Sequence, residues 1–207
     1  MPDSTSTLAD RIRASEQTHE PVKTQLRTNE RVLARITDGI YRRPASALRE
    51  LVSNAYDADA RHVVILTDAP RFSSILIRDD GNGLTPDSLA HLVQNIGGSP
   101  KRRFEGADLE VTDKDDPNRS PGGRQLIGKM GIGIFSVAQL TRHFLISTKR
   151  AGDNFRTIAD ITISGGLSEQ RLLNLEKAGD DSIETGDVLI LREPDSNSNA
   201  HGTELNY

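Results

Sequence analysis

Residues 47–60 read ALRELVSNAYDADA, and this segment decides the fold. Its apolar residues recur at helical spacing and predict one buried helix face. Glu50, Asn54 and Asp57 form a second stripe along the edge of that face, where a pocket wall would stand. An amphipathic helix whose polar side chains meet solvent explains the same pattern. The stripe therefore indicates a site only if other segments complete it. The apolar residues are Leu48, Leu51, Val52, Ala55 and Ala58.

Two strand-like runs follow this helix, residues 62–67 (HVVILT) and 74–78 (SILIR). The second run ends in a turn-prone segment that leads into a capped helix over residues 87–95. In this turn, a carboxylate at the strand end can accept a hydrogen bond from an exocyclic amine, and the glycines leave room for a flat ligand. Asp and Gly populate ordinary turns as well, and Asp80 is interpreted as solvated. The turn residues proposed for ligand contact are Asp79, Gly81 and Gly83.

A long polar segment separates this turn from a second glycine cluster. Residues 100–125 are charged and broken by Gly and Pro, which indicates either a disordered insertion or a functional lid. The following LIGKMGIGIFSVAQL predicts a glycine-rich turn that leads into an apolar helix ending near Thr141. Its glycines, residues 128, 131 and 133, would let the backbone approach an anion at the helix N-terminus. An ordinary turn uses the same residues, and Met130 replaces the hydroxyl of a P-loop.

The remaining segments suggest the fold class. Residues 1–28 contain few large apolar side chains and predict a flexible arm with at most one short helix. The order is helices, two strands, helices and then several strands, which differs from strict βαβ alternation. It predicts an α+β two-layer sandwich with a mixed, mostly antiparallel sheet and helices on one face. Further helices are expected from residue 29 and over 168–178, and further strands over 144–148, 157–163, 188–191 and from 202.

Composition excludes several classes of function. The chain has 207 residues, 35% hydrophobic and 27% charged, with a net charge of −4. No apolar run is long enough to span a membrane, and the acidic balance argues against direct nucleic-acid binding. The absence of cysteine excludes disulfides and thiolate metal sites, and it fits a cytoplasmic location. The five histidines lack paired metal-ligand spacing, so no zinc site is expected.

Three motifs and a terminal strand occur in one order: Glu-x-x-x-Asn-x-x-Asp-Ala (50–58), Asp-x-Gly-x-Gly (79–83), Gly-x-x-Gly-x-Gly (128–133) and Gly-Thr-Glu-Leu (202–205). Together they resemble the ATP-binding domain of the GHKL ATPases, which has the Bergerat fold. That group contains gyrase B, the ninety-kilodalton heat-shock chaperone, histidine kinases and MutL, with MORC proteins alongside. The resemblance is strongest to the chaperone, MORC and MutL branch. It implies an ATP-binding domain over residues 29–207 with a lid at about 97–127.

The resemblance implies a role for each matching residue. Glu50 would activate the attacking water as general base, and Asn54 would hold Mg²⁺ together with triphosphate oxygens. Asp79 would read the adenine amine with support from Thr203. Asp57 would either orient a lysine or water, or stabilise the helix. The other implied nucleotide contacts are Gly81 and Gly83 at the base, Asn95, Ser99 and Lys101 at the sugar or phosphates, and Gly128, Gly131, Ile132 and Gly133 in the phosphate cradle. Lys101 also fits a solvated lid base, and Lys129 is expected to be exposed.

The resemblance implies Mg²⁺-dependent ATP binding and slow hydrolysis that drive lid closure and homodimerisation of a chaperone-like or MORC-like switch. Glu50 favours hydrolysis, because the histidine kinases of the group usually lack this acid. Two alternatives stay open: an ATP- or ADP-sensing module without significant hydrolysis, and a histidine-kinase-like phosphotransferase. Family ATPases usually receive a Lys or Arg from a following domain. The chain is therefore expected to be the N-terminal fragment of a longer protein, with weak turnover alone and with client or effector binding in the C-terminal domains.

Overall fold

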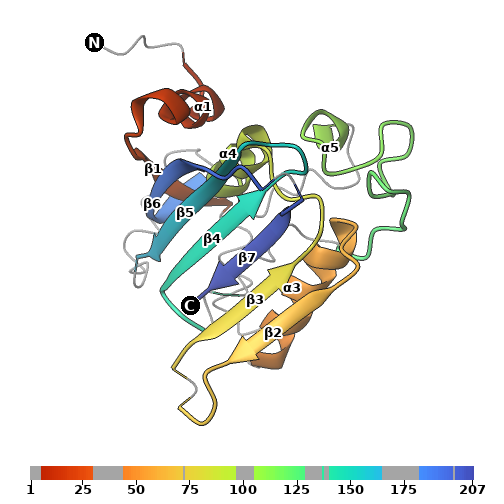
Figure 1. The fold of residues 1–207 in the computed structure, drawn as a ribbon. Coiled ribbons are helices and arrows are strands. Elements are labelled where there is room, and N and C mark those ends of the chain that lie inside the picture. Colours follow the sequence, from red (N-terminus) through yellow and green to blue (C-terminus); the bar gives the residue numbers. More distant parts are fainter. Residues whose placement is uncertain are drawn as a thin grey trace.

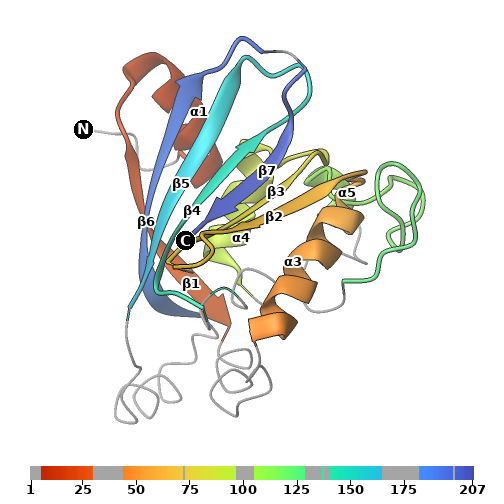
Figure 2. The same cartoon turned by 60° about the horizontal axis from the view of Figure 1, so that its bottom comes forward.

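The computed structural model describes residues 6–29, 44–71, 73–96, 105–128, 137, 140–164, 182–197 and 199–207. Its strands form one seven-stranded sheet in the order β1-β6-β5-β4-β7-β3-β2, and every neighbouring pair is antiparallel. Helices α1, α3 and α4 lie on one face of this sheet (Figure 1; Figure 2). The expected α+β two-layer sandwich is confirmed. The strands are β1 (Val22–Asn29), β2 (Val63–Thr67), β3 (Ile75–Asp79), β4 (His143–Lys149), β5 (Phe155–Ile163), β6 (Ser182–Pro194) and β7 (Gly202–Asn206), and the helices are α1 (Leu8–Thr18), α3 (Pro44–Asp57), α4 (Pro86–Gln94) and α5 (Glu105–Asp108).

One row of apolar side chains crosses the whole sheet on its helix-covered face. Because strand residues alternate between the two faces, the pairing register places one residue of each strand in this row. All are buried except Ile65, which lies on the edge strand β2. The row consists of Val22, Ile190, Ala159, Ile146, Leu205, Ile77 and Ile65. The core therefore lies between this row and the three helices, and burial of the row supplies much of the driving force for folding.

The N-terminal segment differs from the expected flexible arm. Over residues 6–29 it forms α1 and the edge strand β1, and β1 pairs with β6 along its length. Ile12 and Leu26 are almost fully buried in the core. The sequence hides this arrangement because β1 has only two apolar residues in VKTQLRTN. Its polar backbone is satisfied by β6 and its buried face is covered by α1, so the strand needs few apolar side chains.

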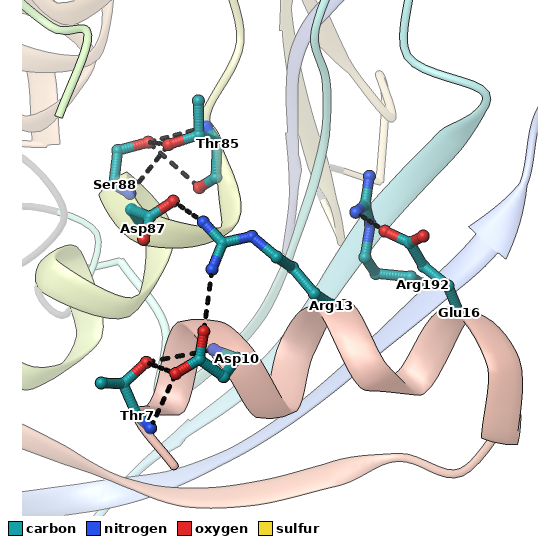
Figure 3. A network of polar contacts seen from close by, with 8 residues as sticks. All are labelled: Thr7, Asp10, Arg13, Glu16, Thr85, Asp87, Ser88 and Arg192. Atoms are coloured by element: carbon teal, nitrogen blue, oxygen red, sulfur yellow. Dashed lines mark hydrogen bonds and ion pairs between the residues drawn. The ribbon is translucent and has the colours of Figure 1, made fainter.

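Charged side chains fix α1 to the rest of the domain (Figure 3). Arg13 of α1 pairs with Asp87 in the first turn of α4. Glu16 of α1 pairs with Arg192 of β6, whose guanidinium also pairs with Asp153. Arg192 is nearly fully buried, and a buried guanidinium is tolerated only when carboxylates compensate its charge. The N-terminal helix is therefore an integral part of the helical layer.

The remaining elements match their sequence patterns within a few residues. Helix α4 begins after Thr85, whose hydroxyl accepts a hydrogen bond from the backbone N–H of Ser88, and Pro86 occupies its first turn. Strand β6 is much longer than the predicted residues 188–191, because Asp187 and Gly186 continue its pairing with both β5 and β1, and residues 182–184 pair with β1 beyond a register shift. The predicted helices from residue 29 and over 168–178 lie outside the described residues. Val137, from the predicted apolar helix after the glycine cluster, is helical and fully buried.

Residues 105–128 form an ordered segment. Beyond the single turn of α5 they consist of hydrogen-bonded turns, with Leu126 and Ser120 buried. Of the two interpretations of the polar segment, disorder is therefore wrong for these residues. Within the described part of the chain, no helix is long and apolar enough to cross a membrane.

Candidate functional site

Helix α3 carries the polar stripe predicted from the sequence. Leu51 and Ala55 are buried, as the helical spacing predicted, and Ala47 is buried with them. Leu48 and Ala58 are half-buried, but Val52 is exposed, so its predicted place on the buried face is wrong. The side chain of Glu50 is 23% exposed, and Arg49 approaches it to 4.0 Å. Asn54 is half-buried one turn further along. The stripe therefore lies at the border between core and solvent, which is the position that a pocket wall requires.

Asp79 ends β3 and is the best-defined polar group of the candidate site. Its Oδ1 accepts hydrogen bonds from the backbone N–H groups of Gly81 (2.9 Å) and Thr203 (3.3 Å). The predicted support from Thr203 thus comes from its backbone. Among the described residues, no donor reaches Oδ2, which keeps its capacity to accept a hydrogen bond from a ligand. Burial raises the pKa of the Asp79 carboxyl above its ordinary value, and the two backbone hydrogen bonds only partly oppose this shift.

The two glycines of the Asp79 turn are required by the protein itself. A Cβ on Gly81 would lie 2.7 Å from the carbonyl oxygen of Ala58. Gly83 has φ +69°, and a Cβ there would lie 2.2 Å from the carbonyl oxygen of Lys149. The turn therefore packs directly against the residue that follows α3 on one side and against the end of β4 on the other, which leaves no room for a side chain. Close packing of a base on the same glycines stays a prediction.

Asp57 hydrogen-bonds the backbone where the second glycine cluster begins. Its carboxylate accepts hydrogen bonds from the backbone N–H groups of Ile127 (2.9 Å) and Gly128 (3.0 Å), and its residue exposure is 2%. A buried carboxylate that bonds two consecutive amides fixes the backbone at that point. The geometry thus gives Asp57 a positioning role that neither sequence-based alternative contained. It also brings the start of the predicted phosphate cradle next to the helix that carries Glu50 and Asn54.

Asp80 differs from the solvated neighbour that was expected. Its carboxylate accepts hydrogen bonds from the backbone N–H groups of Arg61 (2.7 Å) and His62 (2.8 Å), and from the His62 ring (2.7 Å). These bonds, that from the His62 backbone above all, hold the pKa of Asp80 well below its ordinary value. Asp80 therefore ties the start of β2 to the end of β3, although its side chain is partly exposed.

Several residues that shape the site carried no sequence signal. Thr148 of β4 accepts a hydrogen bond from the backbone N–H of Leu84 (2.8 Å) and lies 3.1 Å from the Thr203 hydroxyl. The His201 ring donates to the carbonyl of Gly81 (2.8 Å). Asp59 contacts both the Asp79 turn and the segment 118–124. Asp59 directly follows the motif of residues 50–58, and its role depends on tertiary contacts that no local pattern shows.

Other predicted site residues are placed elsewhere or not described. Asn95 ends α4 at the surface. It lines a depression of about 480 Å³ together with residues of α1, β1 and β6, among them Arg11 and Arg27. Its contact with a nucleotide stays a prediction. The predicted contacts Ser99, Lys101, Gly131, Ile132 and Gly133 lie outside the described residues, as does Lys129.

The described side chains fit a magnesium ion that is coordinated mainly by the phosphates of a bound nucleotide. Among the described residues, no group of three or more His, Asp or Glu side chains could hold a metal ion. Mg²⁺ bound with a nucleotide needs only one or two protein oxygens, because phosphate oxygens and waters complete its octahedron. The amide of the half-buried Asn54 on α3 offers one such oxygen.

Comparison with known proteins agrees with this geometry. The family model described as "Histidine kinase-, DNA gyrase B-, and HSP90-like ATPase" matches residues 41–188, more than half of the chain. MutL, a DNA mismatch repair protein, of Bradyrhizobium diazoefficiens is 35% identical over 138 residues, which cover 66% of this chain and 20% of the relative. The chaperone protein HtpG of Anaplasma phagocytophilum is 30% identical over 185 residues, which cover 80% of this chain and 27% of the relative.

The chain spans only about a quarter or less of the length of these relatives. The matched range begins just before α3 and ends within β6, so it contains the polar stripe, the Asp79 turn and the second glycine cluster. The chain therefore belongs to the family of histidine kinase-, DNA gyrase B- and HSP90-like ATPases, near its HSP90 and MutL members.

Proposed function

We propose that this domain binds ATP with Mg²⁺ and hydrolyses it slowly, and that ATP drives lid closure and pairing of two copies in a chaperone-like or MORC-like switch. The observation that carries the proposal is the part-buried Asp79 carboxylate at the end of β3. Its Oδ1 is engaged by Gly81 and Thr203, and its Oδ2 is left to accept from an exocyclic amine. ATP and ADP are the ligands proposed for this turn, and the cytoplasm is the proposed location.

The proposed mechanism divides the chemistry between α3 and the glycine cluster. Glu50 takes a proton from water as the water oxygen attacks the γ-phosphorus. The bond from that phosphorus to the bridging oxygen breaks, and ADP leaves with the electron pair. Asn54 would hold Mg²⁺ through its amide oxygen, and the ion would neutralise part of the phosphate charge. Backbone amides of Gly131, Ile132 and Gly133 hold the β- and γ-phosphates, and Asp57 fixes the backbone that leads to them through Ile127 and Gly128.

Two substitutions test the proposal in the longest natural form of the protein. Glu50→Ala should keep affinity for Mg-ATP and lose phosphate release by at least about a hundredfold, since general-base catalysis contributes that much. Asp79→Asn should lower affinity for adenosine and ATP alike, because its amide presents an N–H to the ligand's amine. Titration calorimetry measures binding, and a phosphate-release assay measures turnover. Turnover that survives in Glu50→Ala would remove its role as base.

Two other outcomes would support the alternatives. Tight ATP binding without phosphate release in the wild type would favour an ATP- or ADP-sensing module. Phosphohistidine on the protein or on a co-purified partner would favour a phosphotransferase. The part-buried Glu50 on α3 argues for hydrolysis over phosphohistidine chemistry, because it places an acid on the same stripe as the proposed Mg²⁺ ligand, Asn54.

A further inference from the structure

Three segments meet where α3 ends, and Asp59 lies between them. Asp59 follows the last turn of α3 with φ +64°, a left-handed conformation that Asp adopts more readily than most residues. On one side lies the Asp79 turn, and on the other lies the segment 118–128. The two views show this segment beside one end of α3 (Figure 1; Figure 2).

The Asp59 carboxylate bonds both neighbours at once. Its Oδ1 accepts from the Ser120 hydroxyl (2.5 Å), and its Oδ2 accepts from the side-chain amide of Asn82 (2.9 Å) and from the backbone N–H of Gly122 (2.7 Å). Asn82 stands between the two glycines of the Asp79 turn. A Cβ on Gly122 would lie 2.6 Å from Asp59 Oδ1, so the segment approaches the carboxylate as closely as its backbone permits.

Arg124 adds further contacts between this loop and the residues at the end of α3. Its guanidinium donates to the carbonyl oxygen of Ala60 (2.6 Å), lies 3.9 Å from Asp59 Oδ1 and stacks over the Tyr56 ring at 5.2 Å. Its backbone N–H donates to the buried Ser120 hydroxyl (2.9 Å). The hydroxyl thus accepts from Arg124 and donates to Asp59, which makes the loop and the carboxylate one hydrogen-bonded unit.

We propose that Asp59 is a positioning residue that holds the segment 118–128 in the place required for binding the phosphates of ATP. This inference rests on the proposed function, because it assigns the phosphates to the glycine cluster that begins at Gly128. The segment is continuous with that cluster. Asp57 bonds its last two residues, Ile127 and Gly128, and Ile127 lies five positions after Gly122, the last loop residue that hydrogen-bonds Asp59. Asp59 therefore acts on the nucleotide through the backbone of the loop and touches no reacting atom.

The adenine end should depend on Asp59 much less than the phosphate end. The Asp79 turn has anchors of its own: Asn82 N–H donates to the carbonyl of Ala58 (2.7 Å), and His201 donates to the carbonyl of Gly81. The loop 118–124, by contrast, is held to α3 chiefly through Asp59 and through the bond from Arg124 to Ala60. Loss of the carboxylate should therefore loosen the loop and leave the turn in place.

The left-handed backbone of Asp59 offers a well-matched variant. Asp59→Gly removes the carboxylate and adds no strain at φ +64°, because glycine adopts this region freely. Asp59→Asn keeps the side-chain shape and one acceptor oxygen, but its NH₂ group would face a donor from Ser120, Asn82 or Gly122. Its loss of affinity for AMPPNP should therefore be smaller than that of Asp59→Gly. Asp160→Asn is the control, since this partly exposed acid pairs with His143 across β4 and β5, away from the junction.

The test compares two ligands in wild type and variants by titration calorimetry, in the presence of Mg²⁺. In Asp59→Gly, affinity for the non-hydrolysable analogue AMPPNP should fall by about tenfold or more, while affinity for adenosine changes by less than about threefold. Hydrogen exchange of residues 118–128 in the unliganded protein should rise in the same variant. Asp160→Asn should change neither quantity.

Each outcome bears on the inference. A purely structural role of Asp59 would lower affinity for adenosine and AMPPNP by the same factor, and that result would overturn the inference. Unchanged hydrogen exchange in 118–128 would also overturn it. If the wild type binds neither adenosine nor AMPPNP, the proposed function itself is wrong. If the wild type binds both ligands and the variant shows either result above, only the role of Asp59 is wrong.

Discussion

Asp79 and Asp80 are neighbours in the sequence whose carboxyl groups have opposite pKa shifts. Burial raises the pKa of Asp79, whereas hydrogen bonds from His62 and Arg61 hold that of Asp80 below its ordinary value of 3.8. The sequence Asp-Asp-Gly-Asn-Gly predicted a ligand-contacting role for Asp79 from its position at a strand end, and this role stays a prediction. It could not show that Asp80 bonds the start of β2, because that contact depends on how two strands pair.

The lowered pKa of Asp80 predicts a pH-dependent contribution to stability. Its pKa is lower in the folded than in the unfolded chain, so the carboxylate stabilises the fold above pH 4 and loses this effect as the pH falls below about 4. Asp80→Asn should lower the Tm at pH 7 by about 2–4 °C, a modest effect for a partly exposed group. Thermal unfolding of both proteins between pH 3 and 7 should show this difference shrinking toward pH 3. A difference independent of pH would contradict the assignment.

Gly83 and Gly123 allow conformational strain to be separated from steric clash. Both have positive φ, but a Cβ on Gly83 would lie 2.2 Å from the carbonyl oxygen of Lys149, whereas nothing lies within 4 Å of one on Gly123. Gly123→Ala should therefore cost only the left-handed conformation, about 1–2 kcal/mol. Gly83→Ala should cost about 1–3 kcal/mol more, because the backbone must shift. Urea unfolding measures both, and equal losses would show that the close approach at Gly83 relaxes freely.

At the scale of elements, local patterns predicted helices and buried strands better than polar edge strands. Helix α3 and strands β2 and β3 lie within a few residues of the predicted ranges. Strand β1 was missed because its stability comes from pairing with β6 and from the cover of α1, and neither is encoded in its own alternation. The order of the strands in the sheet was likewise absent from any single segment.

The packing of α1 predicts a loss of stability that would not be expected if residues 1–28 were a flexible arm. Ile12 is fully buried between α1 and the sheet, so Ile12→Ala should lower the free energy of unfolding by about 2–5 kcal/mol. Gln17→Ala, at an exposed position of the same helix, should change it by less than about 0.5 kcal/mol. Denaturant titration of both variants provides the comparison. Similar small effects would mean that α1 contributes little to the folded domain.

At the scale of the whole molecule, the candidate site is assembled from segments far apart in the chain. The motifs at residues 50–58 and 79–83 could be recognised from the sequence because each needs specific residue types at short spacing. Their mutual placement could not, because it depends on Asp57 bonding Ile127 and Gly128 and on Asp59 bonding Asn82 and Ser120. These carboxylates connect the Asp79 turn, the loop 118–124 and Gly128, where the second glycine cluster begins.

This connection leads to a prediction about assembly. If the phosphates of ATP fix the loop that Asp57 and Asp59 already hold at one end, AMPPNP with Mg²⁺ should stabilise one closed conformation and promote pairing of two chains. Sedimentation velocity should then show a dimer that forms with AMPPNP and not with adenosine, because adenosine lacks the phosphates that the cradle would hold. Asp79→Asn should stay monomeric at AMPPNP concentrations that saturate the wild type. It should dimerise only when a higher AMPPNP concentration fills its nucleotide site. A dimer that forms equally with adenosine would show that pairing does not depend on the phosphate end of the site.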